Sequence, residues 1–247
     1  MVLLLATVST LVMNYLSNAL PLFGHDNKQI SDALPNAFTP AGLTFAVWGV
    51  IFLGLIVFAV YQALPAQRGL RFDRLFWPFL LSNLLNSAWL CAFQSLNFGL
   101  SVVLMLGLLS SLVWLYLTLS GMELQGAERL TLGVPGSLCL AWISVATVAN
   151  VTAWLVSTGV KEGLIGLSPQ LWSALLLVVA SLIGAAMLAR RRDLAFGAVM
   201  AWAFYGVYLA RPQEGTVLTG VLVATALLLA GAVAGFAGRR RHPLLSH

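Results

Sequence analysis

Charged residues are scarce in this chain. Only 9% of its 247 residues are Asp, Glu, Lys or Arg, whereas an ordinary soluble domain carries about 25%. Hydrophobic residues make up 60%, which is more than one soluble domain of this length could bury. We therefore expect an integral membrane protein, with the lipid bilayer as its first partner.

Other absences exclude further classes of protein. The only cysteines, Cys91 and Cys139, lie in apolar runs near opposite membrane faces, so we expect no disulfide. No cluster of His, Cys and carboxylates has metal-ligand spacing, so we expect no metal site. The net charge of +5 comes from basic residues at the ends of apolar runs, without a basic stripe that interleaves aromatics. We therefore expect no nucleic acid partner.

The apolar residues form continuous runs of about 20 residues, the length that spans a bilayer as a helix. They do not alternate with period two, which excludes a transmembrane barrel. The first run is long for a secretory signal and follows no basic segment, so we interpret it as a span. The fold class is all-α, a polytopic transmembrane helix bundle with about eight spans. The expected spans are 2–22, 41–64, 75–96, 99–120, 132–157, 169–189, 194–210 and 216–237.

Eight spans place both termini on one side of the membrane. Of the 13 Lys and Arg residues, 10 fall on that side and 3 on the other. By the positive-inside rule both termini are expected in the cytoplasm, with the protein in the cell (inner) membrane. The first group is Arg68, Arg71, Arg74, Arg129, Arg190, Arg191, Arg192, Arg239, Arg240 and Arg241. The second is Lys28, Lys161 and Arg211.

No ionisable residue lies well inside a predicted span, which disfavours a proton relay or a carrier of charged substrates. The polar groups that remain inside the predicted spans are mainly amides and indoles. On the fifth span, positions 142, 146, 150 and 154 advance by only about 40° per step and so share one helix face. Trp48, Trp89 and Asn150 lie at matching depths on three spans, roughly 10 Å below the outer surface. The candidate ligand-binding residues are Trp48, Asn83, Asn86, Trp89, Trp142, Ala146, Asn150 and Trp154.

These side chains favour an aromatic cavity with a few amides, which is typical of a site for a flat, hydrophobic ligand. The alternative stays open that the amides only join helices, at roughly 0.6 kcal/mol each, and that the indoles only pack or anchor. The polar segment 24–36 between the first two spans is interpreted as a connector, with a lid as the alternative.

Three motifs occur in order along the chain: TPAGLTFAVW at 39–48, SNLLNSAW at 82–89 and WISVATVANVTAW at 142–154. They resemble the TspO/translocator protein family of tryptophan-rich sensory proteins. Members have five transmembrane helices and bind porphyrins, sterols and synthetic aromatic ligands. The resemblance implies that Trp48, Asn83, Trp142, Ala146 and Asn150 occupy pocket positions.

The chain departs from the family pattern at several positions. Ala41 replaces a proline, and Leu43 and Asn86 each replace a tryptophan. Leu155 replaces the arginine that follows the last motif. Three further spans follow, so we divide the chain into a TspO-like five-helix core, 1–158, and a three-helix extension with a basic cytoplasmic tail, 159–247.

The expected function is binding of a hydrophobic, tetrapyrrole-like or sterol-like ligand in a sensory or regulatory role. A carrier for a neutral hydrophobic solute and a structural assembly subunit are the alternatives. Catalysis is not expected, because no acid, base, nucleophile or metal group is placed in the cavity; porphyrin degradation is implied by the resemblance alone. No cofactor is required, a porphyrin or haem-like molecule is the candidate ligand, and a homodimer is left open.

Overall fold

The computed structural model describes residues 1–247 except 21–22, 35–36, 68, 161–165 and 238–247. Over the described residues the regular structure is helical and includes no strand, which confirms the all-α prediction. Eight long helices are α1 (Val2–Ala19), α3 (Val47–Ala63), α5 (Phe76–Gln94), α6 (Phe98–Ser120), α7 (Val134–Ser157), α8 (Pro169–Ala186), α9 (Leu194–Ala210) and α10 (Gly215–Ala237). The short elements are α2 (Asn27–Ala33), η1 (Gly42–Ala46), η2 (Pro65–Gln67), α4 (Leu70–Asp73), η3 (Arg129–Gly133) and η4 (Met187–Arg191).

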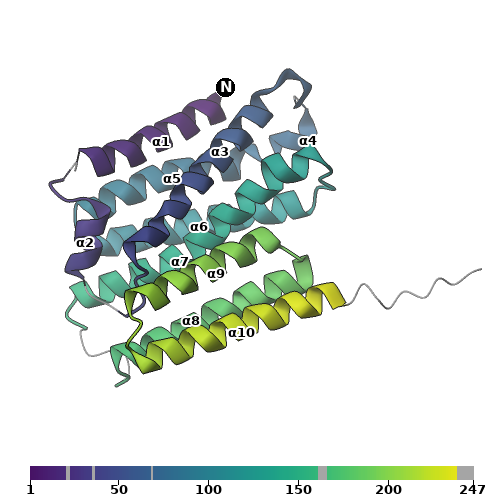
Figure 1. Ribbon diagram of the computed structural model, residues 1–247. Helices are drawn as coiled ribbons and strands as arrows, with labels where there is room; N and C mark the ends of the chain where they lie inside the picture. The colour runs from purple at the N-terminus through teal and green to yellow at the C-terminus, as the bar shows by residue number, and fades with distance from the viewer. Residues whose placement is uncertain (21–22, 35–36, 68, 161–165, 238–247) are drawn as a thin grey trace, which may run out of the picture.

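The long helices run alternately up and down in one bundle (Figure 1). Within the part of the chain that the structure describes, seven helical segments are long and apolar enough to cross a membrane. The remaining predicted span, 194–210, is α9, which has the predicted bounds but only 17 residues. The start of α1 and the end of α10 lie at the same end of the bundle, and α2 lies at the other. This arrangement fits an even number of spans, while the cytoplasmic placement of the termini stays a prediction.

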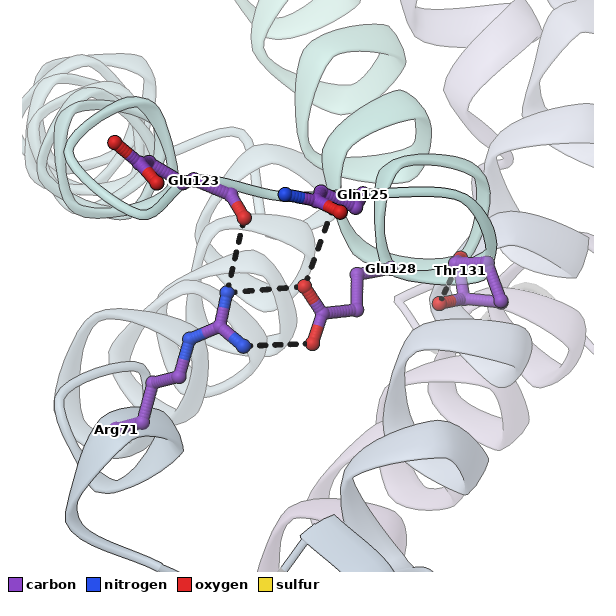
Figure 2. A network of polar contacts seen from close by, with 6 residues as sticks. Arg71, Glu123, Gln125, Glu128 and Thr131 are labelled. Atoms are coloured by element: carbon purple, nitrogen blue, oxygen red, sulfur yellow. Dashed lines mark hydrogen bonds and ion pairs between the residues drawn. The ribbon is translucent and has the colours of Figure 1, made fainter.

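The end of the bundle where α1 starts carries an ion pair between Arg71 of α4 and Glu128 before η3 (Figure 2). Two guanidinium nitrogens lie 2.9 and 3.0 Å from the two carboxylate oxygens. One of them also donates to the Glu123 carbonyl at 3.1 Å. The pair therefore fastens the α6–α7 connection to α4. Among the basic residues used to orient the chain, Arg68, Lys161, Arg239, Arg240 and Arg241 lie outside the described residues.

Helix α7 lies at the centre of the bundle and contacts α3, α6, α8 and α9. The first helix packs at the edge, against α3 and α5. Its buried residues are all polar, although the helix as a whole is apolar: Thr7, Thr10, Asn14 and Ser17. Its leucines and valines largely face outward. We call the contact between α1 and α5 the α1–α5 seam.

Side-chain hydrogen bonds join the α1–α5 seam. Asn14 Nδ2 donates to Asn86 Oδ1 at 2.8 Å, and Thr10 Oγ1 donates to the Asn83 carbonyl at 3.1 Å. At one end of the seam, Gln94 Nε2 donates to the Ser17 carbonyl at 2.9 Å. A hydrogen bond between transmembrane helices contributes about 0.6 kcal/mol on average, so the seam is held by several modest contacts.

Helices α8 and α10 meet through small residues instead. A Cβ added at Gly220 would lie 2.8 Å from Ala174 Cβ, and one added at Gly231 would lie 2.6 Å from the Ala185 backbone. Backbones that approach this closely gain van der Waals contact, which is the main attraction between helices in lipid. We call this contact the α8–α10 seam.

Candidate ligand-binding cavity

A cavity of about 320 Å³ lies between α1, α3, α5 and α7 and is closed at one end by α2 and residues 39–45. Its side chains come from parts of the chain that are far apart in sequence, and none of the described lining residues belongs to α8, α9 or α10. This location agrees with the predicted 1–158 core. The division into core and extension itself stays a prediction.

Helix α7 creates the space for the cavity. It presents Ala146, Ala149 and Ala153 to the cavity, together with Trp142 and Asn150. Alanine side chains end at Cβ, so a gap remains that larger residues at these helical positions would fill. The short side chains of α7 therefore make the hollow and the neighbouring helices supply its aromatic walls.

The aromatic walls are built from interlocking rings. Trp48 stacks on Phe52 with ring centroids 5.0 Å apart, and it lies nearly perpendicular to the Trp142 ring with centroids 6.2 Å apart. Phe45 also lies nearly perpendicular to the Trp142 ring, with ring centroids 5.8 Å apart. Such pairs contribute about 0.5–1.5 kcal/mol beyond the area that they bury. The rings are therefore held in fixed orientations around the cavity.

Asn150 braces one of these indoles. Its Oδ1 accepts a hydrogen bond of 2.6 Å from Trp89 Nε1, and its Nδ2 donates to Ser101 Oγ at 2.9 Å. The serine hydroxyl in turn donates to the Phe98 carbonyl. One buried amide thereby joins α5, α6 and α7 and fixes the Trp89 ring at the cavity wall. The amide acts on the cavity through the indole that it holds.

Two residues of the lining each have a buried polar atom without a hydrogen-bond partner among the described residues: Trp142 Nε1 and Asn27 Oδ1. Trp142 is only 2% exposed. The described lining residues include no Asp, Glu, Lys or Arg. Over the same described part of the chain, no group of His, Cys and carboxylates could hold a metal ion. The cavity therefore offers aromatic surface and a few neutral polar groups.

Residues 39–45, at the closed end of the cavity, are held by hydrogen bonds from the C-terminal half of the chain. Trp202 Nε1 of α9 donates to the Thr44 carbonyl at 2.8 Å, and Ala41 N donates to the Gly206 carbonyl at 2.9 Å. Arg211 donates to the Thr39 carbonyl at 3.0 Å. Burial lowers the pKa of this guanidinium, and the neighbouring Glu214 carboxylate opposes that shift. The entry segment of α3 is therefore anchored to α9, although α9 does not reach the cavity.

Helix α2 covers the cavity at the same end and contributes Asn27 and Ser31 to its lining. Asp26 caps this helix in a capping box with Gln29, in which each side chain bonds the backbone of the other residue. The described part of the polar segment 24–36 thus includes a helix that covers the cavity, where the sequence favoured a connector. The placement matches the lid alternative, while opening and closing stay a prediction.

Five of the predicted site residues line the cavity: Trp48, Trp89, Trp142, Ala146 and Asn150. Their role in binding a ligand stays a prediction. The other three predicted residues do not line it. Asn83 and Asn86 belong to the α1–α5 seam. Trp154 is 37% exposed. It follows Trp142 by twelve residues, which on a helix turns its side chain by about 120° from that of Trp142 and away from the cavity face.

Sequence reasoning missed several lining residues. Asn14 and Asn18 come from α1, which the prediction treated only as an apolar run. The polar stripe at positions 7, 10, 14 and 17 has helical spacing and was the signal that could have revealed a buried face. Phe52 and Phe93 line the cavity one turn beyond Trp48 and Trp89. Their spacing of four residues predicts that each pair shares a helix face.

Comparison with known proteins gives a family match. A family model described as TSPO-like protein matches residues 1–235. The match thus includes α8, α9 and most of α10 as well as the helices around the cavity. No curated protein and no solved structure matches the chain.

Proposed function

The chain belongs to the TSPO-like protein family, and on that premise we propose that it binds a flat, hydrophobic small molecule in the cavity between α1, α3, α5 and α7. The observation that carries the proposal is the wall of interlocked rings around a cavity of about 320 Å³. Ligand sites are commonly apolar and aromatic with a few placed polar groups. The seven long apolar helical segments place this cavity in an integral membrane protein.

The size of the cavity bears on the ligand. Ligand pockets usually measure about 300–1,000 Å³, so this one lies at the small end. A tetrapyrrole-like or sterol-like ligand is the expectation from family resemblance, and the volume favours the smaller members of that range. A porphyrin or haem-like molecule would need the α2 cover to move or would enter only in part.

A binding role in sensing or regulation is our first proposal, and the cavity chemistry supports binding more than catalysis. Its described lining holds indoles, amides, hydroxyls and alanines, none of which is arranged as an activated nucleophile with its base. A carrier, an assembly subunit and a homodimer stay as further hypotheses for the same chain. We propose the cell (inner) membrane as its location.

Titration of the purified protein in nanodiscs with protoporphyrin and with a sterol tests the proposal. Trp48→Ala removes one wall and Ala146→Phe fills the hollow, so each should weaken binding of any ligand that uses the cavity. A loss of about tenfold corresponds to 1.4 kcal/mol, within reach of one lost aromatic contact and its buried area. Trp114→Ala is the matched control, because Trp114 is exposed on α6 and does not line the cavity.

The result that would overturn the proposal is equal affinity in wild type, both cavity variants and the control. Thermal unfolding is followed in parallel, so that a variant that fails to fold is recognised. Trp48→Ala adds no volume, so it keeps the test decisive if Ala146→Phe does not fold.

A further inference from the structure

Two adjoining hollows lie on the surface at the end of the bundle where α1 starts. The first, of about 860 Å³, has a polar lining that includes Arg74 and Glu123. The second, of about 460 Å³, is lined largely by apolar side chains, among them Trp77 and Leu117. Both are lined by Arg74 and by the two residues that follow α6, so we treat them as one α5–α6 groove with a polar arm and an apolar arm. None of its described lining residues belongs to the aromatic cavity.

The groove holds charged side chains of both signs that the protein leaves unpaired. Arg71 is bound to Glu128 (Figure 2). In contrast, the guanidinium of Arg74 makes no hydrogen bond or ion pair with the described residues, and neither do the carboxylates of Asp73 and Glu123. All three of these side chains are exposed. Among the described residues, the groove therefore offers a ligand one unpaired cation and two unpaired carboxylates.

The apolar arm lies at the level where headgroups and acyl chains of a bilayer meet. Trp77 is 60% exposed and Leu117 is 55% exposed. Trp77 is the second residue of α5, and Leu117 lies about one turn before the end of α6. Tryptophan is enriched at this level of membrane helices because its ring is amphipathic. An acyl chain can therefore lie against these side chains while its headgroup reaches Arg74.

The charges of the polar arm discriminate between lipid headgroups. A guanidinium binds a phosphate group through charge-assisted hydrogen bonds. A carboxylate repels a further negative charge and accepts hydrogen bonds from a primary ammonium group, which has three N–H donors. Phosphatidylethanolamine carries a phosphate and a primary ammonium group two carbons apart. Phosphatidylglycerol lacks the cation, and the quaternary ammonium group of phosphatidylcholine has no N–H to donate.

We propose that the α5–α6 groove is a binding site for phosphatidylethanolamine. The lipid phosphate binds Arg74, the ammonium group binds Asp73 and Glu123, and an acyl chain lies against Trp77. The groove is separate from the aromatic cavity, so this inference does not rest on the proposed function. A lipid that only surrounds the protein would contact the same apolar side chains, but its binding would depend neither on the headgroup nor on Arg74.

Native mass spectrometry of the purified full chain in detergent tests the inference, because it resolves the binding of single lipid molecules. Phosphatidylethanolamine, phosphatidylcholine and phosphatidylglycerol with the same acyl chains are titrated in turn. We expect the first to bind wild type about fivefold more tightly than either of the others. Glycerophosphoethanolamine has the same headgroup without acyl chains and should not displace the lipid.

Two sets of variants separate the two halves of the headgroup. Arg74→Gln should weaken phosphatidylethanolamine and phosphatidylcholine equally, since both carry the phosphate. We expect a loss of about fivefold, typical of one basic residue at an anionic membrane surface. Asp73→Asn combined with Glu123→Gln should abolish the preference for phosphatidylethanolamine over phosphatidylcholine without weakening phosphatidylcholine.

Arg190→Gln is the matched control. Arg190 is an exposed residue of η4 that does not line the groove. It lies at the same end of the bundle, because the adjacent Arg192 donates from Nε to the Gly235 carbonyl near the end of α10 at 2.7 Å. The control should change none of the three affinities.

The inference is overturned if wild type binds the three lipids equally or if Arg74→Gln leaves the affinities unchanged, since either result describes unspecific surrounding lipid. Tighter binding of phosphatidylglycerol would overturn the assignment of the ammonium group to the carboxylates. Displacement by glycerophosphoethanolamine would overturn the role of the apolar arm. Thermal unfolding is recorded for each variant, and the carboxylate variant still tests the headgroup preference if Arg74→Gln does not fold. Each of these outcomes leaves ligand binding in the aromatic cavity unaffected.

Discussion

The α1–α5 seam and the α8–α10 seam join transmembrane helices in opposite ways. The first uses side-chain hydrogen bonds from Thr10, Asn14 and Gln94, and its helix α1 buries polar residues while its apolar residues face outward. The second brings glycines of α10 against Ala174 and Ala185 of α8. Lipid solvates apolar side chains well, so either polar pairing or close backbone packing is needed to hold helices together.

This comparison also separates two asparagines that look alike in the sequence. Asn86 and Asn150 are both buried amides in apolar helices. Asn86 bonds Asn14 across the α1–α5 seam, whereas Asn150 holds the Trp89 indole at the cavity. An amide in a membrane helix therefore identifies a buried polar contact, and only its neighbours decide whether that contact belongs to a site.

Gly231→Ala should have the largest effect on stability. The new methyl would lie 2.6 Å from the Ala185 backbone, and backbone cannot swing aside as a side chain can. We expect a loss of about 3 kcal/mol, the upper end of the usual cost of overpacking. The unfolding free energy is measured by titration with SDS from mixed micelles.

Gly215→Ala is the matched control, because a Cβ added there at the start of α10 meets nothing within 4 Å. It should leave stability unchanged or raise it by up to about 1 kcal/mol through reduced flexibility of the unfolded chain. Equal stability of the two variants would mean that close backbone approach does not hold the α8–α10 seam.

Asn14→Ala and Asn86→Ala should have intermediate effects. Each leaves a buried partner unpaired, so we expect about 1–2 kcal/mol per substitution. The coupling measured in a double-mutant cycle should be near 0.6 kcal/mol, typical of a hydrogen bond between membrane helices. Thr219→Ala removes a hydrogen bond within α10 on an exposed face and serves as control. Zero coupling would show that the polar seam is not held by this pair.

Glu128→Gln should have the smallest effect and sharpens the contrast with both seams. The pair with Arg71 lies at the bundle end, and the arginine side chain is 48% exposed. Exposed ion pairs contribute about 0–1 kcal/mol and are screened by salt. The loss should therefore stay below about 1 kcal/mol at low salt and vanish near 1 M salt, while the effects of Gly231→Ala and Asn14→Ala persist. Salt-independent loss would place the pair among the structural contacts.

Much of the fold was predictable from sequence because the length of an apolar run is a direct signature of a membrane helix. The bounds of α9 agree with the prediction, and those of α5, α6 and α7 differ by at most two residues. The helix α2 was not predicted, since its seven residues carry no apolar periodicity. Its capping residues, Asp26 and Gln29, were the available local signal.

The cavity was predictable only in part. Spacing placed Trp142, Ala146 and Asn150 on one face of α7, as the lining shows. The same spacing also predicted that Trp154 faces the cavity, and it does not, because the rotation of about 40° per step accumulates along the helix. The bond between Trp89 and Asn150 depends on how α5 packs against α7, and a single sequence carries no direct signal for such a contact between helices.

The polar face of α1 has a consequence for the order of events during biosynthesis. Thr10 and Asn14 find their partners 73 and 72 residues later in the chain. At roughly 5–20 residues per second, the ribosome takes about 4–15 s to supply them. We expect the nascent first helix to remain loosely held, with its hydroxyls and amides at the insertion channel or the headgroup layer, until α5 emerges and draws it into place.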